Sequence, residues 1–186
     1  DAGLDASRRE VQAERRSYVG SAGLRLLKVA YQGDAAGASE ALRARADPDY
    51  TQPGDDYTPL LAAAYKGHAA VVRALCEGGA DKDRAEASGR TPLLLAAGHG
   101  HLEVVQVLCE LAADLDRAKP DGRTPLFAAA AGGREEIVLA LCAAGAAKDQ
   151  AIEDGATPLL AAAANGHEAA VRALCAAGAD RERARG

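Results

Sequence analysis

The sequence predicts an all-α solenoid, in which short helix-turn-helix units joined by hairpin-like loops stack side by side along the chain. Three observations predict this fold. About a quarter of the 186 residues are Ala and only 3% are aromatic, which suits helices packed closely on helices rather than a β-sandwich or barrel. The pair Leu-Cys and a single Gly each recur every 33 residues. The triplet Thr-Pro-Leu has the same period and begins at Thr58, Thr91, Thr124 and Thr157.

Charge and hydropathy narrow the class of protein further. Charged residues make up 26% of the chain and give a net charge of −5, without a basic stripe suited to nucleic-acid phosphates. Purely apolar runs fall far short of the roughly 20 residues that cross a bilayer. We therefore expect no nucleic-acid partner and no membrane span. The sequence contains no Met, so we expect a processed chain or part of a longer protein.

Residues 1–23 are predicted to form an N-terminal helical extension. Ser7 and Glu10 have the spacing of a capping box, and Leu4, Val11 and Tyr18 recur every seven residues. This stripe predicts a helix of about ten residues. We expect that helix either to lie over the first unit or to reach into a neighbouring molecule.

One unit shows how local chemistry defines each pair of helices. Thr58 is suited to cap a helix, and the Pro that follows is favoured at the first helical position, so residues 59–66 are predicted to be helical. Gly67 permits the left-handed turn that ends this helix. A second helix is predicted over about residues 68–77, with its apolar residues on one face. The polar residues 81–90 then form the loop to the next unit.

The predicted helices are too short to be stable individually. Helices of eight to ten residues have few internal hydrogen bonds and a costly nucleation step. Their stability must therefore come from neighbouring units that cover each other's apolar faces. Leu108 lies on such a face, and we predict that it is part of the buried core.

The repeated residues carry a resemblance to a known family. Thr-Pro-Leu, the Ala pair that follows it, Gly-His, the Val-Val…Leu-Cys face and Gly-Ala-Asp resemble the ankyrin repeat. The resemblance covers residues 24–186 and implies an ankyrin-repeat solenoid with a divergent first repeat that lacks Thr-Pro-Leu. The repeats are assigned to 24–57, 58–90, 91–123, 124–156 and 157–186.

The chain departs from the family pattern at two repeated positions. The His that usually follows Thr-Pro-Leu is replaced by an apolar residue, so we expect its hydrogen bond to be replaced by apolar packing. The replacements are Leu61, Leu94, Phe127 and Leu160. The Asn usual after Gly-Ala-Asp-x is replaced by an acidic residue. These acidic residues are Asp83, Asp116, Asp149 and Glu182.

The sequence offers little for catalysis or for binding a metal or cofactor. All four cysteines occupy one repeated position, and packed helices about 8–10 Å apart are too distant for a disulfide or a shared zinc ion. We expect them to be reduced, buried core thiols. His99 and His101 have no third metal ligand nearby in the sequence. No serine lies in a Gly-x-Ser-x-Gly turn, and no phosphate-binding glycine motif is present. We therefore predict a non-enzymatic protein without a cofactor or a metal.

The resemblance implies that a protein partner binds the concave face, formed by the loop tips and the exposed sides of the first helices. The variable positions of that face, carried over from the family, supply the candidate contact residues. They are Tyr31, Gln32, Tyr57, Tyr65, Lys66, Ser88, Arg90, His99, Asp121, Arg123, Glu153, Asp154 and Asn165, and we add Tyr50 from the first long loop.

Four of these candidates suggest where binding is centred. Tyr31 and Tyr65 fall at equivalent positions of adjacent repeats, and Tyr50 and Tyr57 lie on the loop between them. Tyr and Arg are common anchors of protein interfaces, so we predict that binding is centred on the N-terminal repeats. The alternative is that these tyrosines only cover a thin, Ala-rich core.

The leading interpretation is a protein-interaction module or scaffold, and two alternatives remain open. The last repeat ends with the same apolar face as the inner repeats, without the polar cap that solenoids normally need, so further repeats or another subunit are expected to cover it. The first alternative is an accessory subunit held permanently in a large complex. The second is a regulatory segment of a larger enzyme or channel. Free thiols at regular spacing favour an intracellular, reducing compartment. We expect the cytoplasm by default, with a processed organellar protein as the alternative.

Overall fold

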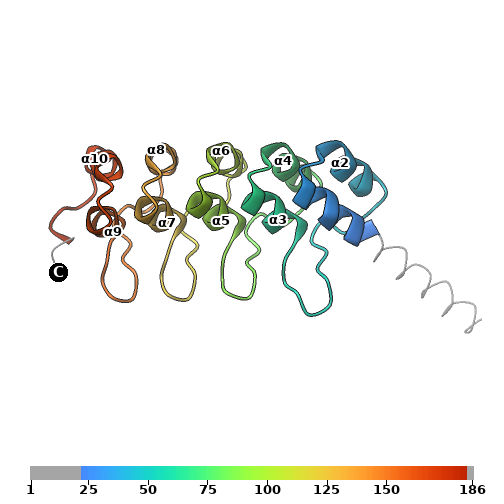
Figure 1. The fold of residues 1–186 in the computed structure, drawn as a ribbon, viewed down its shortest axis with the longest axis horizontal. Helices are drawn as coiled ribbons and strands as arrows, with labels where there is room; N and C mark the ends of the chain where they lie inside the picture. Colours follow the sequence, from blue (N-terminus) through green and yellow to red (C-terminus); the bar gives the residue numbers. More distant parts are fainter. Residues whose placement is uncertain (1–21, 184–186) are drawn as a thin grey trace, which may run out of the picture.

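The computed structural model describes residues 22–183, which form an elongated stack of helix pairs in two layers (Figure 1). One layer holds the first helix of each pair. It consists of helical residues 22–32, α3 (Pro59–Lys66), α5 (Pro92–His99), α7 (Pro125–Ala131) and α9 (Pro158–Ala164). The other layer holds the second helices. These are α2 (Ala35–Arg43), α4 (Ala69–Glu77), α6 (Leu102–Glu110), α8 (Glu135–Ala144) and α10 (Glu168–Ala176).

This all-α repeat architecture is the one that the sequence predicts, and no strand is present in residues 22–183. The helix predicted near the N-terminus lies outside the described residues. Within them, no helix has the length and hydropathy that a membrane span requires.

The first helices begin where the repeated residues predict, and α3 and α5 also end at the repeated Gly, whereas α7 and α9 end one residue earlier, at Gly132 and Asn165. The hydroxyl of Thr58 accepts a hydrogen bond from the backbone N–H of Leu61 at 3.2 Å, and the same cap recurs at the other Thr-Pro-Leu triplets. The threonine side chains are almost completely buried, so each cap lies within the packed interior of the stack. Gly67 ends α3 in the left-handed conformation, with φ of 81°.

Histidines tie the second helices to the preceding repeat. The Nε2 atom of His101 lies 2.8 Å from the backbone oxygen of Tyr65, and His68 and His167 make the equivalent contacts one repeat before and two repeats after. The imidazole of His101 packs flat over Gly67, where a Cβ atom would lie 2.6 Å from Nδ1. The repeated Gly thus serves both the turn and the contact between repeats.

The core runs between the two layers along the whole stack. Its largest members are leucines and valines from both layers, with Ala filling the close approaches. Leu108 on α6 is fully buried, and α6 lies between α4 and α8. The apolar surface of each unit is therefore covered by its neighbours, as expected for a solenoid.

The cysteines are less buried than the sequence predicts. Each is a free thiol that is half-buried and packs against the edge of the core, because it follows the buried Leu of its helix and is rotated away from the centre by one residue. Burial raises the pKa of Cys76 to about 11. This thiol is therefore protonated at neutral pH, a form of low reactivity.

The acidic residues that replace the family's Asn form a ladder between the long loops. Asp83 accepts a hydrogen bond from the backbone N–H of Asp114 at 2.8 Å, and Asp116 accepts one from Ala147 at 2.8 Å. Asp149 does the same with the N–H of Asp180. A carboxylate can therefore make the bond that links each loop to the next, in place of an amide oxygen.

Two turns hold a residue that is poorly suited to its backbone conformation, Arg45 after α2 and Ala112 after α6. After α6, Ala112 adopts φ of 56°, at the position where Gly79 and Gly145 adopt 93° and 99° after α4 and α8. This left-handed region is unfavourable for residues with a Cβ atom.

Replacing Ala112 by Gly is therefore expected to raise the free energy of unfolding by about 0.5–1 kcal/mol, because relief of the Cβ strain exceeds the added entropy of the unfolded chain. Urea denaturation followed by circular dichroism measures the change. The opposite substitution, Gly79→Ala, is the control and is expected to destabilise the chain. An Ala112→Gly variant that is less stable than the parent would contradict this explanation.

Candidate binding surface

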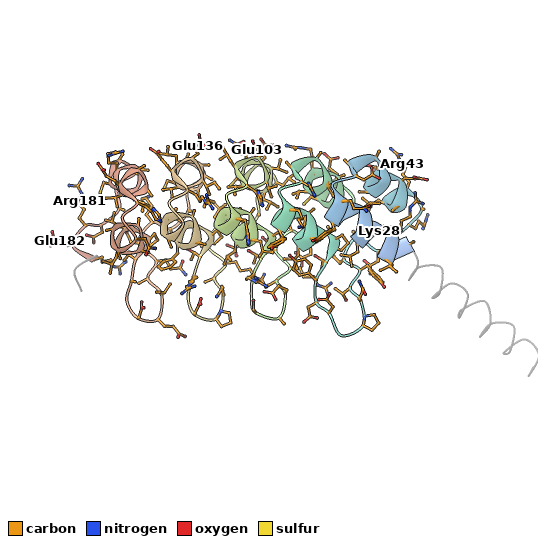
Figure 2. The ribbon with its side chains drawn as sticks, in the orientation of Figure 1. Lys28, Arg43, Glu103, Glu136, Arg181 and Glu182 are labelled. Atoms are coloured by element: carbon orange, nitrogen blue, oxygen red, sulfur yellow. The ribbon has the colours of Figure 1, made fainter. Side chains whose placement is uncertain are left out.

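The candidate residues lie mainly on one side of the stack, which we call the loop face. It is formed by the long loops 44–57, 78–90, 111–123 and 145–156 and by the exposed sides of the adjacent first helices. In Figure 1 the loops project from the first-helix layer in one direction, and α3, α5, α7 and α9 line their base. Figure 2 places the labelled Glu103 and Glu136 on the second-helix layer, away from these loops.

Two tyrosines and a lysine form an exposed cluster at the N-terminal part of the loop face. Tyr31 is 51% exposed and Tyr65 is 37% exposed. The ammonium group of Lys66 lies 4.4 Å from the ring centroid of Tyr31 and 5.5 Å from that of Tyr65. A hydrogen bond with Tyr31 raises the pKa of Lys66, so the lysine is cationic at neutral pH. The Lys66 ammonium group therefore bridges the two rings by cation–π contacts.

An apolar hollow of about 500 Å³, which we call the N-terminal hollow, adjoins this cluster. The first helix, the loop that follows α2, and α3 all contribute to its lining. The lining residues are Leu24, Leu27, Lys28, Tyr31, Gln32, Gln52, Asp55, Tyr57 and Ala62. Of the predicted contact residues, Tyr31, Gln32 and Tyr57 therefore meet here, whereas the exposed Leu24 has no counterpart in the prediction.

The four tyrosines do not have equivalent roles. Tyr57 is partly buried, and that burial raises its pKa to about 12, so its hydroxyl keeps its proton and remains a hydrogen-bond donor. The ring of Tyr50 packs directly over Gly23 on the first helix, where it leaves no room for a Cβ atom. Tyr50 thus covers the packing of the first repeat, the alternative role considered for all four rings.

A histidine continues the aromatic row into the next repeat. The ring of His99 packs edge-on against Tyr65, with centroids 4.6 Å apart and an interplanar angle of 68°. Its Nδ1 atom lies 2.8 Å from the backbone oxygen of Leu95. The ring of His101 stacks beside it at 6.2 Å. The predicted residues Tyr31, Tyr65, Lys66 and His99 thus form one continuous ridge.

A second hollow of about 670 Å³, the C-terminal hollow, lies beyond this ridge. Basic side chains from two long loops and small or apolar residues from α5, α7 and α9 line it. The lining residues are Arg90, Leu94, Lys119, Arg123, Phe127, Ala128, Ala131, Gly132, Ile152, Asp154, Ala156, Ala161, Ala164 and Asn165. The predicted residues Arg90, Arg123, Asp154 and Asn165 line this hollow. Arg90 is near enough to Tyr57 and Tyr65 to interact with them electrostatically, so the two hollows adjoin the same tyrosines.

Ion pairs within single loops fix the basic side chains of the C-terminal hollow. Asp121 lies 2.8 Å from the ammonium group of Lys119 and 3.6 Å from Nε of Arg123. Glu86 pairs with Nε of Arg90 at 2.8 Å and also accepts hydrogen bonds from the Ser88 hydroxyl and from two backbone N–H groups. Asp121, a predicted contact residue, therefore positions the cations and does not itself line the hollow.

The carboxylate of Glu86 is expected to stabilise its loop in a pH-dependent way. Burial alone would raise the pKa of Glu86, but the hydrogen bonds from Arg90 and Ser88 outweigh it and lower the pKa from 4.5 to about 2. A lowered pKa in the folded state means that the stabilisation is complete above about pH 4.5 and is lost as the pH falls towards 2.

Glu86→Gln is expected to lower the free energy of unfolding by about 1 kcal/mol at pH 7, a value reduced for solvent screening, and by much less near pH 3. Urea denaturation of both chains at the two pH values tests this. Glu153→Gln on the last long loop, whose side chain makes no ion pair within residues 22–183, is the control. A difference between Glu86→Gln and the parent that is equal at both pH values would refute the assignment.

The described residues contain no constellation for metal binding. No group of three or more His, Cys, Asp or Glu side chains within residues 22–183 could hold a metal ion. The two hollows are lined by apolar, aromatic and basic side chains, and aromatic residues and Arg are enriched at protein interfaces.

Comparison with known proteins identifies the family. The family described as ankyrin repeats (three copies) matches residues 26–119 and 111–184, so the matches together span most of the chain. The chain therefore belongs to the ankyrin repeat family, as its repeated motifs indicate. Ankyrin repeats are protein–protein interaction modules, and proteins of this family are typically non-enzymatic. No curated protein matches the chain.

Proposed function

We propose that the chain is a non-enzymatic interaction module or scaffold that binds a protein partner on its loop face, which corresponds to the concave face of the family. Binding is centred on the N-terminal repeats. The observation that carries this proposal is the exposed Tyr31–Lys66–Tyr65 cluster beside the N-terminal hollow.

Three properties of this region support the proposal. The two tyrosine rings are exposed and yet held in place by Lys66, so little side-chain entropy is lost when a partner covers them. Tyr is a common anchor of interface energy. The exposed Leu24 next to Tyr31 adds apolar surface that a partner would remove from water.

Simultaneous replacement of Tyr31, Tyr57 and Tyr65 by Ala is expected to weaken partner binding by about tenfold or more, because interface anchors lie among such residues. The partner is first identified by crosslinking and mass spectrometry of native material, and its affinity for both chains is then measured by calorimetry. Circular dichroism checks that the variant stays folded. Tyr50→Ala is the matched control, since Tyr50 packs on the first helix, and is expected to affect stability more than affinity. Unchanged affinity of the triple variant would overturn the proposal.

The exposed apolar residues also favour a second candidate function, that of an accessory subunit held permanently in a larger complex. Leu24 and Leu139 are each about half exposed, on opposite layers of the stack, and a permanent subunit would bury both. Gel filtration of the isolated chain separates the candidates. A well-behaved monomer supports reversible binding, whereas aggregation that a Leu139→Ser substitution relieves supports the permanent subunit.

A further inference from the structure

The C-terminal hollow lies where the first helices α7 and α9 lack large side chains at one repeated position. Tyr65 is the seventh residue of α3, and the residues at the same position of α5, α7 and α9 are Gly98, Ala131 and Ala164. The chain therefore forms a ridge over α3 and leaves open space over α7 and α9. That space is large enough for several side chains of another molecule.

The floor of the hollow is apolar and well ordered by packing. Leu94 and Phe127 line it and are each only 6% exposed. Ala128, Ala131 and Ala161 complete the base with small side chains. A bulky apolar side chain that entered from outside would therefore contact carbon on several sides, a favourable environment for its burial.

The rim of the hollow carries three basic side chains, whose ion-pair partners Glu86 and Asp121 lie outside the lining. Arg90, Lys119 and Arg123 line it, and the only acidic lining residue is Asp154. Both arginines use Nε in their ion pairs. The two Nη groups of each guanidinium are thereby left as donors, in the planar arrangement that matches a carboxylate.

We propose that the C-terminal hollow binds a segment of the protein partner in which a large apolar side chain stands next to an acidic side chain. The apolar side chain lies over Phe127 and Ala131, and the carboxylate pairs with the Nη groups of Arg90 or Arg123. This inference rests on the proposed function, because it takes the loop face as the binding surface. It adds a second contact region, beyond the tyrosine ridge, and defines the chemistry that the partner presents there.

A blocked synthetic peptide tests the chemistry directly. The probe is acetyl-Gly-Ser-Glu-Phe-Glu-Ser-Gly-amide, whose only charges are the two Glu carboxylates, titrated into the ¹⁵N-labelled full chain. We expect saturable amide shifts that are confined to residues 90–94, 119–132 and 152–165. Peptides with Gln in place of both Glu, or with Ala in place of Phe, are expected to bind about fivefold more weakly or worse, because each lacks one of the two interactions. Equal binding of the Gln peptide would overturn the proposal.

Two pairs of variants test the location. Ala164→Leu fills the hollow, whereas Ala163→Leu makes the same change at the neighbouring exposed residue of α9, outside the lining. Arg123→Gln removes one rim cation, and Arg172→Gln removes an exposed arginine of α10 that pairs with Glu168. We expect Ala164→Leu and Arg123→Gln to weaken binding of the probe and their controls to leave it unchanged. Equal effects within either pair would overturn the location.

The outcomes for this inference and for the proposed function are separable. If the native partner loses affinity with the triple tyrosine variant but not with Ala164→Leu or Arg123→Gln, the proposed function stands and this inference fails. If it is insensitive to all of these changes, both fail. If sedimentation shows a dimer of the chain that Ala164→Leu dissociates, a second copy fills the hollow and the inference is overturned.

Discussion

Replacing Leu108 by Ala is expected to lower the free energy of unfolding by about 2–5 kcal/mol, the range for large-to-small changes at fully buried sites. Leu108 is 0% exposed, in the middle of the stack. Its helix α6 contacts α4 on one side and α8 on the other. The lost side chain therefore leaves a cavity between units as well as within one, and short helices depend on these contacts because they are marginal alone. Urea denaturation followed by circular dichroism measures the loss.

Leu139→Ala is the matched control for this prediction. Leu139 lies on the neighbouring helix α8 and is 47% exposed, so the same chemical change there is expected to cost less than about 1 kcal/mol. A loss below about 1 kcal/mol for Leu108→Ala would mean that the position can repack around the deletion. In that case the central units would not depend on the tight interlocking that the structure shows.

The fold could be predicted from the sequence because the residues that begin and end the helices act locally and recur in successive repeats. The caps at Thr58 and its equivalents, the Pro at the first helical position and the left-handed Gly67 determine where each first helix begins and ends. These features act within a few residues, and their 33-residue period shows which segments are equivalent. Contacts between repeats are harder to predict. For example, the sequence shows that Asp83 replaces the family's Asn, but it does not show that the carboxylate accepts a hydrogen bond from the next long loop.

The candidate site could be predicted only in part, for a physical reason. Aromatic residues such as Tyr31 and Tyr65 stand out in this sequence as candidate interface anchors, and in the structure both side chains are exposed. A hollow is instead created by residues that lack side chains, such as Ala131 and Ala164, and in an Ala-rich chain these do not stand out. The sequence feature that indicates the hollow is the change from Tyr65 to small residues at the same repeated position of the later first helices.

Tyr50 and the cysteines show the limits of the same reasoning. Position in the repeat places a residue on a helix or a loop, but the direction of its side chain depends on its neighbours. Tyr50 and Tyr57 belong to the same loop, but the ring of Tyr50 packs over Gly23 on the first helix. Cys76 follows Leu75 by one residue, and this single step separates full burial from half burial.

Replacing Asp116 by Ala is expected to lower the free energy of unfolding by about 1–3 kcal/mol, the cost of leaving a partly buried hydrogen-bond donor without its partner. The carboxylate of Asp116 accepts the backbone N–H of Ala147 at 2.8 Å. This bond joins two successive long loops through residues that are 31 positions apart in the chain. Because the stability of a solenoid depends on contacts between nearest neighbours, we also expect a broader urea transition, as the units on either side of the lost bond begin to unfold separately.

Two control variants distinguish the loss of the hydrogen bond between repeats from the loss of a negative charge. Asp116→Asn keeps an acceptor oxygen and restores the residue usual in the family, so stability and steepness are expected to stay close to those of the parent chain. Asp114→Ala removes a carboxylate from the same loop that, within residues 22–183, accepts only the N–H of Asp116, two residues away. Its effect should be smaller and leave the transition steep. If Asp116→Ala and Asp114→Ala behave alike, the carboxylates act only by shaping their own turns. In that case Asp116→Asn would be no more stable than Asp116→Ala. The cooperativity of unfolding along the stack would then come from the histidine contacts and the apolar core.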